Sequence, residues 1–388
     1  MEHTPEDYIE NFKFYPDPEK GILRYLIKTT APGEIKINTS FDGKDTGSVT
    51  ERTGGTLRGE IKLSETHLWE IGKGGIYDAE IIFGDDKVKT YFGLSDPHME
   101  GKKFILNGKS VFQRLVLDQG FYPDGIYTAP TEDDLVKDIK LSMDAGFNGA
   151  RLHEKVFEPR FLYHADRLGY MVWGEYPNWG FDLNRFDIEP FMINWREAME
   201  RDFNHPSLVG WCPFNETWGT DHNQKAIASV SAVYKMTKDL DPSRPVIDTS
   251  GLIHTSESDI FDIHDYEQNV EKFASHYEKL SEGIVKDVNY ADGYKGGPMF
   301  VSEYGGIGLK SDSGWSYGEA PEDAPALIRR YDGLTTYLLD NPDIFAFCYT
   351  QLYDIEQEIN GLYTYDRVPK MDISKIRAIN EKTAAIEK

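Results

Sequence analysis

Apolar and polar residues alternate over short stretches in the first quarter of the chain. Such stretches occupy residues 23–27, 34–37 and 59–63. Turns rich in glycine and aspartate separate them at residues 42–43, 54–55 and 84–86. Alternation of this kind is typical of strands with one buried face. The pattern therefore predicts a small antiparallel β-sandwich over residues 1–95, with 87–94 as its last strand and a linker at 95–98.

From about residue 103 the pattern changes to short apolar runs that alternate with helical periods. The runs expected to form strands are 112–117, 149–153, 171–174, 208–214, 245–248, 260–264, 299–302 and 345–349. Short apolar runs are typical of parallel strands that are buried on both faces. Eight of them, alternating with helices, predict a (β/α)8 TIM barrel over residues 103–388. A doubly wound open sheet is disfavoured because no glycine-rich phosphate loop follows any strand.

Helical periodicity falls between most of these strands. Leu135, Ile139 and Met143 recur every four residues, and Ala145-Gly146 marks the end of that helix. Further helices are expected at 159–168, 190–203, 224–240, 270–280, 325–339 and 373–386. Only the fifth expected strand, 245–248, lacks a convincing helix after it.

Charge and composition exclude several classes of protein. The formal net charge is -24 over 388 residues, which argues against nucleic acid or an anionic membrane surface as a partner. No apolar stretch approaches the ~20 residues of a membrane span, and the N-terminus lacks the shape of a signal peptide, so a cytoplasmic location is the default unless a signal has been removed. The two cysteines, Cys212 and Cys348, exclude a disulfide scaffold and should be buried free thiols. The sequence indicates no oligomeric state.

The most informative chemistry is a pair of glutamates at the ends of two apolar runs. Glu216 ends the fourth expected strand and Glu303 ends the seventh. Carboxyl ends of barrel strands carry the active sites of barrel enzymes, and strands four and seven face each other across the mouth. Paired carboxylates are what glycoside hydrolysis requires, in either a retaining or an inverting geometry. The structural alternative is that both acids cap helices or pair with surface bases.

Neighbouring residues fit the same chemistry. Asn215 is placed to donate to a sugar hydroxyl, and Arg151 could keep Glu303 ionised. Trp211 and Trp218 could supply the apolar surroundings that raise the pKa of an acid, and Trp218 is also a candidate for substrate binding. Polar residues at other strand ends are further candidates for substrate binding: Asp118, His153, Glu175, His264, Tyr266 and Gln351. Each could be structural by itself, but as a group they ring one face of the barrel with donors and acceptors suited to hydroxyl-rich ligands.

Several blocks of sequence resemble glycoside hydrolase family 2, which includes β-galactosidases, β-glucuronidases and β-mannosidases. The blocks are 201–216, 147–153, 300–305 and 360–367, together with 68–72 and 76–78, which are similar to the family's immunoglobulin-like domain. The resemblance implies that Glu216 is the acid/base, that Glu303 is the nucleophile, and that the reaction retains the anomeric configuration. It also implies that the N-terminal sandwich is immunoglobulin-like.

The chain departs from the family pattern at three places. No part of it corresponds to the jelly-roll domain with which family members usually begin. The triplet Glu358-Ile359-Asn360 stands where β-glucuronidases carry Asn-x-Lys, which argues against a glucuronide substrate. Residues 177–180 replace the Glu-x-His of magnesium-dependent β-galactosidases, so no such metal is expected, and no cofactor is expected either.

Three functions remain open at this level. The first is a retaining β-glycosidase that acts on a neutral β-linked sugar. The second is a carbohydrate-binding barrel with little activity because the jelly roll is absent. The third is an endo-acting barrel glycosidase of the same clan, such as a mannanase or cellulase, although such enzymes typically lack a preceding sandwich.

Overall fold

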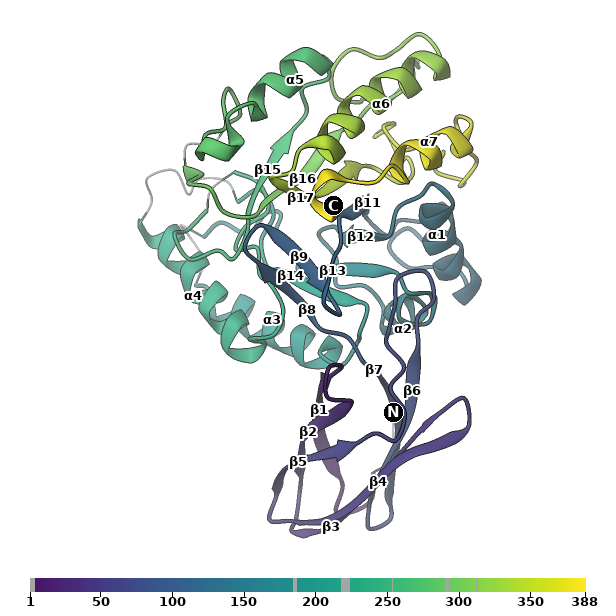
Figure 1. The fold of residues 1–388 in the computed structure, drawn as a ribbon, viewed down its shortest axis with the longest axis vertical. Helices are drawn as coiled ribbons and strands as arrows, with labels where there is room; N and C mark the ends of the chain where they lie inside the picture. Colours follow the sequence, from purple (N-terminus) through teal and green to yellow (C-terminus); the bar gives the residue numbers. More distant parts are fainter. Residues whose placement is uncertain (1–3, 184–186, 218–223, 253, 290–292, 312) are drawn as a thin grey trace.

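A computed structural model describes residues 4–183, 187–217, 224–252, 254–289, 293–311 and 313–388. Two parts follow each other along the chain, a lower all-β part and an upper part in which strands alternate with helices (Figure 1). No helix among the described residues has the length and apolar character needed to cross a membrane.

The N-terminal part is a sandwich of two antiparallel sheets. One sheet has the order β1-β2-β5 and the other has the order β4-β3-β6-β7. The strands are β1 (Ile9–Asp17), β2 (Ile22–Thr29), β3 (Gly33–Phe41), β4 (Lys44–Thr53), β5 (Thr56–Lys62), β6 (Ile76–Phe83) and β7 (Asp86–Gly93). Every second residue of β2 is buried, and its Leu23 and Ile27 pack with Ile37 of β3 in one apolar cluster. The predicted antiparallel sandwich is therefore present, while its immunoglobulin-like character stays a prediction.

A small sheet that the sequence analysis did not predict connects the two parts. It consists of β8 (Pro97–Glu100), β9 (Lys103–Leu106) and β10 (Lys109–Ser110), with the order β10-β9-β8. The expected linker at 95–98 therefore overlaps β8, which begins at Pro97. Phe104 and Leu106 of β9 are buried in the apolar cluster of the helical part, so this sheet extends the core of that part.

The second part is built on a seven-stranded parallel sheet of TIM-barrel type. The strand order is β14-β13-β12-β11-β17-β16-β15, so the first strand of the sheet in the sequence, β11, pairs with the last, β17. The strands are β11 (Gln113–Asp118), β12 (Gly149–Leu152), β13 (Met171–Glu175), β14 (Leu208–Cys212), β15 (Phe261–Asp265), β16 (Met299–Gly305) and β17 (Ile344–Thr350).

The expected fifth strand, 245–248, is not a regular strand. Isolated parallel bridges join Val246 to Trp211 and Ser250 to Asn215. The segment therefore runs beside β14 and its continuation, but it forms no continuous row of backbone hydrogen bonds with them. Pro245 has no backbone N–H to donate. The N–H of Val246 donates to the carboxylate of Asp259 at 3.0 Å instead of to a neighbouring strand. The eight-stranded barrel is thus a seven-stranded sheet plus this bridged segment.

Helices cover the outside of the parallel sheet. They are α1 (Glu132–Asp144), α2 (Pro159–Leu168), α3 (Glu189–Asp202), α4 (Gln224–Leu240), α5 (Val270–Tyr277), α6 (Ala324–Asp340) and α7 (Ile373–Asn380), with short 3-10 turns at Leu280–Glu282 and Ala385–Glu387. Leu135 and Ile139 of α1 are buried as their spacing predicts, and Ala145 caps the helix before Gly146, whose φ is 84°. The helices predicted at 270–280 and 373–386 are shorter in the structure, because α5 and α7 end before these two 3-10 turns.

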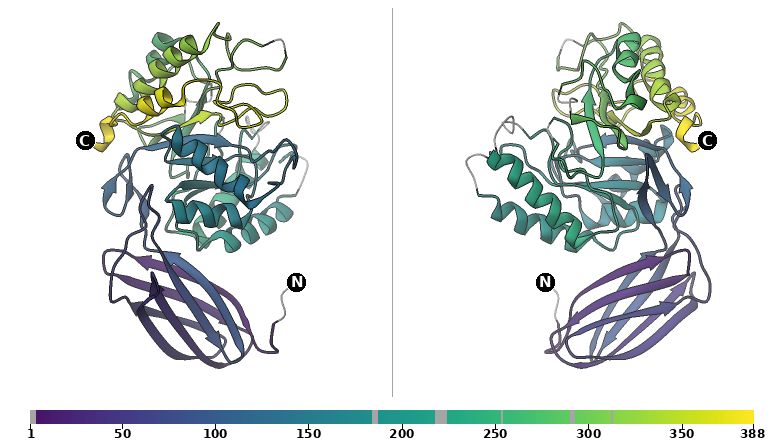
Figure 2. Two further views of the ribbon diagram at one scale, coloured as in Figure 1. Left: turned by 90° about the vertical axis from the view of Figure 1, so that its right-hand side faces the viewer. Right: turned by 60° about the vertical axis from the view of Figure 1, so that its left-hand side comes forward.

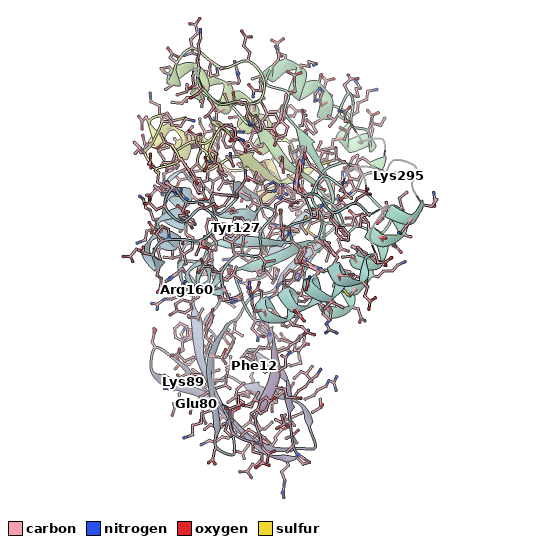
Figure 3. All side chains as sticks on the ribbon, turned by 180° about the vertical axis from the view of Figure 1, so that it is seen from behind. Phe12, Glu80, Lys89, Tyr127, Arg160 and Lys295 are labelled. Atoms are coloured by element: carbon pink, nitrogen blue, oxygen red, sulfur yellow. The ribbon has the colours of Figure 1, made fainter. Side chains whose placement is uncertain are left out.

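The sandwich contacts the barrel at the end from which β13 and β14 start. Asp166 of α2 is central, because its carboxylate accepts from the Tyr91 hydroxyl at 2.9 Å and lies 2.6 Å from Nδ1 of His205. The indole N–H of Trp69 donates to the backbone carbonyl of Asp166 at 2.7 Å. Figure 2 shows the sandwich below the barrel from two further sides, and Figure 3 places Arg160 of α2 above it. The carboxyl ends of the barrel strands therefore lie away from the sandwich.

Candidate active site

Glu216 and Glu303 meet at the carboxyl ends of the barrel strands. Glu303 lies within β16, and Glu216 follows β14 in a left-handed backbone conformation with φ of 38°. The N–H of Glu216 donates to the carbonyl of Ser250 at 2.8 Å, which ties this turn to the bridged segment. One carboxylate oxygen of each glutamate and a ring nitrogen of His264 all lie within 4.8 Å of one another. The two strand ends thus bring the two carboxylates to one point.

Glu303 is buried and surrounded by donors. Tyr266 donates its hydroxyl to Oε2 at 2.5 Å, and Arg151 donates from Nη1 to Oε1 at 3.2 Å. Burial alone would raise the pKa of Glu303, but the electrostatic attraction of His264 and Arg151 outweighs burial and holds that pKa below its usual value. Glu303 is therefore an ionised carboxylate at neutral pH.

Arg151 is the hub beneath the two glutamates. Its side chain is completely buried, and it donates to Glu175 at 2.6 Å, to the carbonyl of Ser302 at 2.7 Å and to Oδ1 of Asn215 at 3.0 Å, in addition to Glu303. Burial would raise the pKa of Glu175, yet the Arg151 charge lowers it to about 2. The guanidinium therefore holds two carboxylates ionised and fixes one amide.

Glu216 has a different environment from Glu303. Nδ1 of His264 lies 2.7 Å from Oε1 of Glu216 and 3.4 Å from Oε2 of Glu303, so the ring spans both carboxylates. The other ring nitrogen of His264 lies 3.0 Å from the Ser250 hydroxyl. Trp211, expected beside Glu216, instead packs edge-on against Trp195 of α3 at 5.5 Å between ring centroids. Trp218 lies outside the described residues.

A cavity of about 360 Å³, here called the strand-end cavity, opens over the two glutamates. Its lining includes Gln119, Phe121, Tyr127, His153, Glu154, Trp179, Asn215, Glu216, Tyr266, Glu303, Trp315, Tyr317, Thr350 and Glu358. Figure 3 labels Tyr127 on the barrel. Of the expected binding residues other than the two glutamates, His153, Asn215 and Tyr266 line the cavity. Asp118, Arg151, Glu175, His264 and Gln351 are not among its lining residues. His264 contacts both Glu216 and Glu303, and Arg151 contacts Glu303 and Asn215.

The contacts below the cavity explain the positions of those buried residues. Tyr353 donates its hydroxyl to Asp118 at 2.5 Å, and burial raises the pKa of Asp118. Gln351 accepts from Gln119 at 2.8 Å and donates to Asn360 at the same distance. Gln351 therefore holds the lining residue Gln119 in place.

Asn215 is oriented by its carbonyl oxygen. Because Oδ1 accepts from Arg151, the amide NH2 is the part of the side chain that is left to donate into the cavity. Its backbone N–H donates to Oδ1 of Asn178 at 2.7 Å, which fixes the residue from a second side.

Several lining residues were not among the expected binding residues. Glu154 accepts the backbone N–H groups of Asn178 and Trp179 with Oε2, at 2.9 and 3.0 Å, and burial raises its pKa to about 7. Burial also raises the pKa of Glu358, to which Gln119 and Asn360 donate at 3.4 and 3.2 Å. Glu154 follows the end of β12 at Leu152, and Trp179 follows the end of β13 at Glu175. This position after a strand end is the sequence signal that could have identified both residues.

Within the described part of the chain, one group of side chains has metal-ligand spacing, and it is the set Glu216, His264 and Glu303 itself. The expected absence of a resident metal or cofactor stays a prediction. Cys212 and Cys348 are buried free thiols, as the sequence predicts.

Known proteins resemble the chain in sequence and in fold. It is 25% identical over 401 residues to a β-glucuronidase of Streptococcus agalactiae, covering 93% of this chain and 65% of that protein. It is 32% identical over 177 residues to a β-galactosidase of Photobacterium profundum, covering 43% of this chain and 16% of that protein. The chain therefore spans less than two thirds of the length of these relatives.

Solved structures share the fold of nearly the whole chain. A β-glucuronidase from an uncultured Clostridium species superposes with a TM-score of 0.80 at 20% identity, covering 98% of this chain and 69% of that one. A β-galacturonidase of Eisenbergiella tayi bound to galacturonate gives 0.79 at 16% identity, covering 98% and 73%. The family model for glycosyl hydrolases family 2, TIM barrel domain, matches residues 98–332. Since that model covers more than half of the chain, the chain belongs to the glycosyl hydrolases of family 2.

Proposed function

We propose that this chain is a retaining β-glycosidase in which Glu216 is the acid/base and Glu303 is the nucleophile. The observation that carries the proposal is the approach of the two carboxylates, whose nearest oxygens lie within 4.8 Å. Retaining enzymes hold their two carboxyl groups about 5–5.5 Å apart, whereas inverting enzymes need a wider gap that admits water.

The reaction would proceed in two displacements. In the first, Glu216 donates its proton to the glycosidic oxygen while a carboxylate oxygen of Glu303 attacks the anomeric carbon, which breaks the bond to the leaving group. In the second, Glu216 takes a proton from water, and that water attacks the anomeric carbon and releases Glu303. Two inversions give net retention.

The surroundings of the nucleophile support this division of roles. The low pKa of Glu303 keeps it ionised for attack and makes it a good leaving group in the second step. Asn215 directs its NH2 toward the bound sugar, where a hydrogen bond to a hydroxyl that strengthens in the transition state accelerates both steps.

We further propose that the glycon is a neutral β-linked sugar. Among the described lining residues of the strand-end cavity none is lysine or arginine, and Glu358 contributes a carboxyl group there. Burial would lower the pKa of His153, but the neighbouring Glu175 and Glu303 raise it above its usual value, so His153 is the cationic side chain of the described lining. Its ring already lies 3.5 Å from Glu175 and 3.9 Å from Glu303, so a sugar carboxylate would have to share that cation with two carboxylates. A uronide is the second candidate, because the relatives named above include β-glucuronidases and a β-galacturonidase. A panel of nitrophenyl β-glycosides, with neutral sugars and uronic acids compared directly, separates the two.

The products formed with azide test the assignment of the two glutamates. Glu216→Ala should retain activity on substrates with good leaving groups, and added azide should restore the second step and give a β-glycosyl azide. Glu303→Ala should give the α-glycosyl azide instead. The same anomer from both variants would contradict the assignment. A carbohydrate-binding barrel without activity would show no turnover above that of Glu303→Gln with any substrate.

A further inference from the structure

Lys155 is a buried cation that the double displacement does not use. It lies three residues after the end of β12 and is 6% exposed. Its ammonium group donates to the backbone carbonyl of Gly120 at 2.7 Å and to that of Tyr127 at 2.9 Å. Nζ also lies 4.3 Å from the centre of the Tyr127 ring and 4.9 Å from that of Phe157. Because an ammonium group can be buried only when its charge is compensated, these contacts fix the position of Nζ.

The two carbonyls belong to the first and last residues of one short loop, here called the 120–127 loop. Inside this loop, Tyr122 and Ile126 exchange two backbone hydrogen bonds, at 2.9 and 2.8 Å. These bonds hold the shape of the loop without help from Lys155. Since the ammonium group joins the two ends of the loop, it sets where the loop lies on the barrel.

Gly120 shows how closely the ammonium group approaches the loop. The φ of Gly120 is 64°, and a Cβ atom at this residue would lie 2.7 Å from Nζ of Lys155 and 2.8 Å from the Phe157 ring. The N–H of Gly120 donates to Asp118 at 2.9 Å, so the backbone is held on this side as well. A side chain at residue 120 would therefore force the ammonium group away from the loop.

The 120–127 loop contributes an aromatic wall to the strand-end cavity. Phe121 and Tyr127 both line the cavity, and their rings meet edge-on at 5.1 Å between centroids. Tyr127 is 44% exposed, and its hydroxyl donates to the backbone carbonyl of Glu154 at 3.1 Å. Exposed aromatic rings in a cavity match the C–H face of a sugar ring. Lys155 is not among the lining residues, so it can affect the cavity only through the loop.

A second cation holds the same loop. Arg367 donates to the carbonyl of Phe121 at 2.6 Å, and Asp138 fixes the guanidinium through two hydrogen bonds at 3.0 and 2.9 Å. This attachment remains when Lys155 is replaced. The loop is therefore expected to shift in a Lys155 variant while the barrel stays folded.

We propose that Lys155 is a positioning residue, which binds both ends of the 120–127 loop and thereby places the rings of Phe121 and Tyr127 against the bound sugar. The inference rests on the proposed function, because it takes the strand-end cavity as the glycoside site. The contacts of Lys155 include neither of the two catalytic glutamates. Its loss should therefore weaken binding while bond cleavage continues, which raises KM and leaves kcat nearly unchanged.

Replacement of Lys155 by alanine, followed by addition of an ammonium ion from solution, tests this role. Values of kcat and KM are measured with the nitrophenyl β-glycosides of galactose, glucose and mannose. Lys155→Ala should raise KM about 5- to 150-fold, because two wall side chains must then be ordered when the sugar binds. Propylammonium, which matches the missing atoms, should restore KM in a saturable way. Tetramethylammonium has the same charge but no N–H donor, and it should not restore KM.

Two further variants serve as controls. Lys238→Met is the matched control, because Lys238 of α4 also donates to a backbone carbonyl, that of Arg244 at 3.0 Å, but neither residue lines the cavity. This variant should leave KM unchanged. Gly120→Ala should raise KM as Lys155→Ala does, but propylammonium should not reverse that rise because Lys155 is still present. An unchanged KM in folded Lys155→Ala, a loss confined to kcat, or equal restoration by tetramethylammonium would overturn the proposal.

Hydrogen exchange separates failure of the positioning role from failure of the proposed function. Mass spectrometry follows peptides that cover residues 119–128 in the parent and in Lys155→Ala, with and without propylammonium. The N–H of Gly120 should exchange faster in the variant, and propylammonium should slow it again. If this is observed while the parent turns over no glycoside, the proposed function fails and the role of Lys155 in holding the loop stands. Exchange that Lys155→Ala does not change would overturn that role, and normal turnover would then leave the proposed function intact.

Discussion

Arg151→Met is the substitution whose effects follow most directly from the structure. The guanidinium is completely buried and donates to Glu175, Glu303, Asn215 and the carbonyl of Ser302. Methionine fills a similar volume but provides neither charge nor donors. The variant should therefore change both the ionisation of Glu303 and the stability of the fold.

The size of the ionisation effect can be bounded. An opposite charge within hydrogen-bond distance lowers the pKa of a carboxyl group by about 1–3 units. His264 also lowers the pKa of Glu303 and remains in the variant, so the lower half of that range applies. The acidic limb of the pH profile of kcat/KM, which reports ionisation in the free enzyme, should move up by about 1–2 pH units. That shift corresponds to about 1.4–2.7 kcal/mol.

Stability is the second readout of the same substitution. Removal of one partner of a buried ion pair costs about 3–5 kcal/mol, so Arg151→Met should unfold at lower denaturant or temperature. Arg151→Lys keeps the positive charge and provides a second variant to measure if Arg151→Met fails to fold. Arg160→Met is the matched control, because Arg160 lies on the surface of α2 and its one ion pair among the described residues is with Glu158. An acidic limb that stays in place in folded Arg151→Met would refute the electrostatic role of Arg151.

Three further predictions concern the same cluster. Tyr266→Phe removes the hydrogen bond to Glu303 but keeps the ring stacked on Tyr317, so kcat/KM should fall about 10- to 100-fold while thermal stability changes little; an unchanged kcat/KM would show that the hydroxyl has no catalytic role. Glu175 has a folded pKa of about 2 against an unfolded value of about 4.3, so it stabilises the fold above pH 4.3 and loses this effect as the pH falls toward 2. In denaturant titrations, the free energy of unfolding of wild type should exceed that of Glu175→Gln by about 3 kcal/mol near neutrality, and this difference should shrink between pH 4.3 and 2. A difference that does not depend on pH would contradict the prediction. Zinc ions should inhibit in competition with substrate, and a chelator should reverse the inhibition, because Glu216, His264 and Glu303 have metal-ligand spacing. Inhibition that added substrate does not relieve would place the metal elsewhere.

Strand ends and helical periods could be predicted from the sequence because both depend on local patterns. Short apolar runs predict the buried strand that precedes Glu216 and the one that contains Glu303, and the spacing of Leu135 and Ile139 predicts α1. The β9–β10 hairpin was missed, although Asn107 and Gly108 form a turn with φ of 52° and 75° that is a known hairpin signal.

Other features depend on contacts between distant residues and so have no local signal. The segment 245–248 matches a strand in composition, but the carboxylate of Asp259 takes the N–H that a ladder would use. Arg151 could be proposed as a partner of Glu303, whereas its simultaneous contacts with Glu175 and Asn215 depend on the order in which the strands pair in the folded sheet. Oε1 of Glu154 likewise has no hydrogen-bond partner among the described residues, which is known only once its neighbours in space are placed.

The residue that becomes covalently bound to the sugar decides whether a double displacement on Glu303 takes place. The protein is incubated with an activated 2-fluoro β-glycoside of the preferred sugar, and the mass of the intact chain and of its peptides is measured. We expect one added glycosyl group, located on Glu303 and absent from Glu303→Gln. Glycosidase turnover without a trapped intermediate, or a label on any other residue, would contradict it.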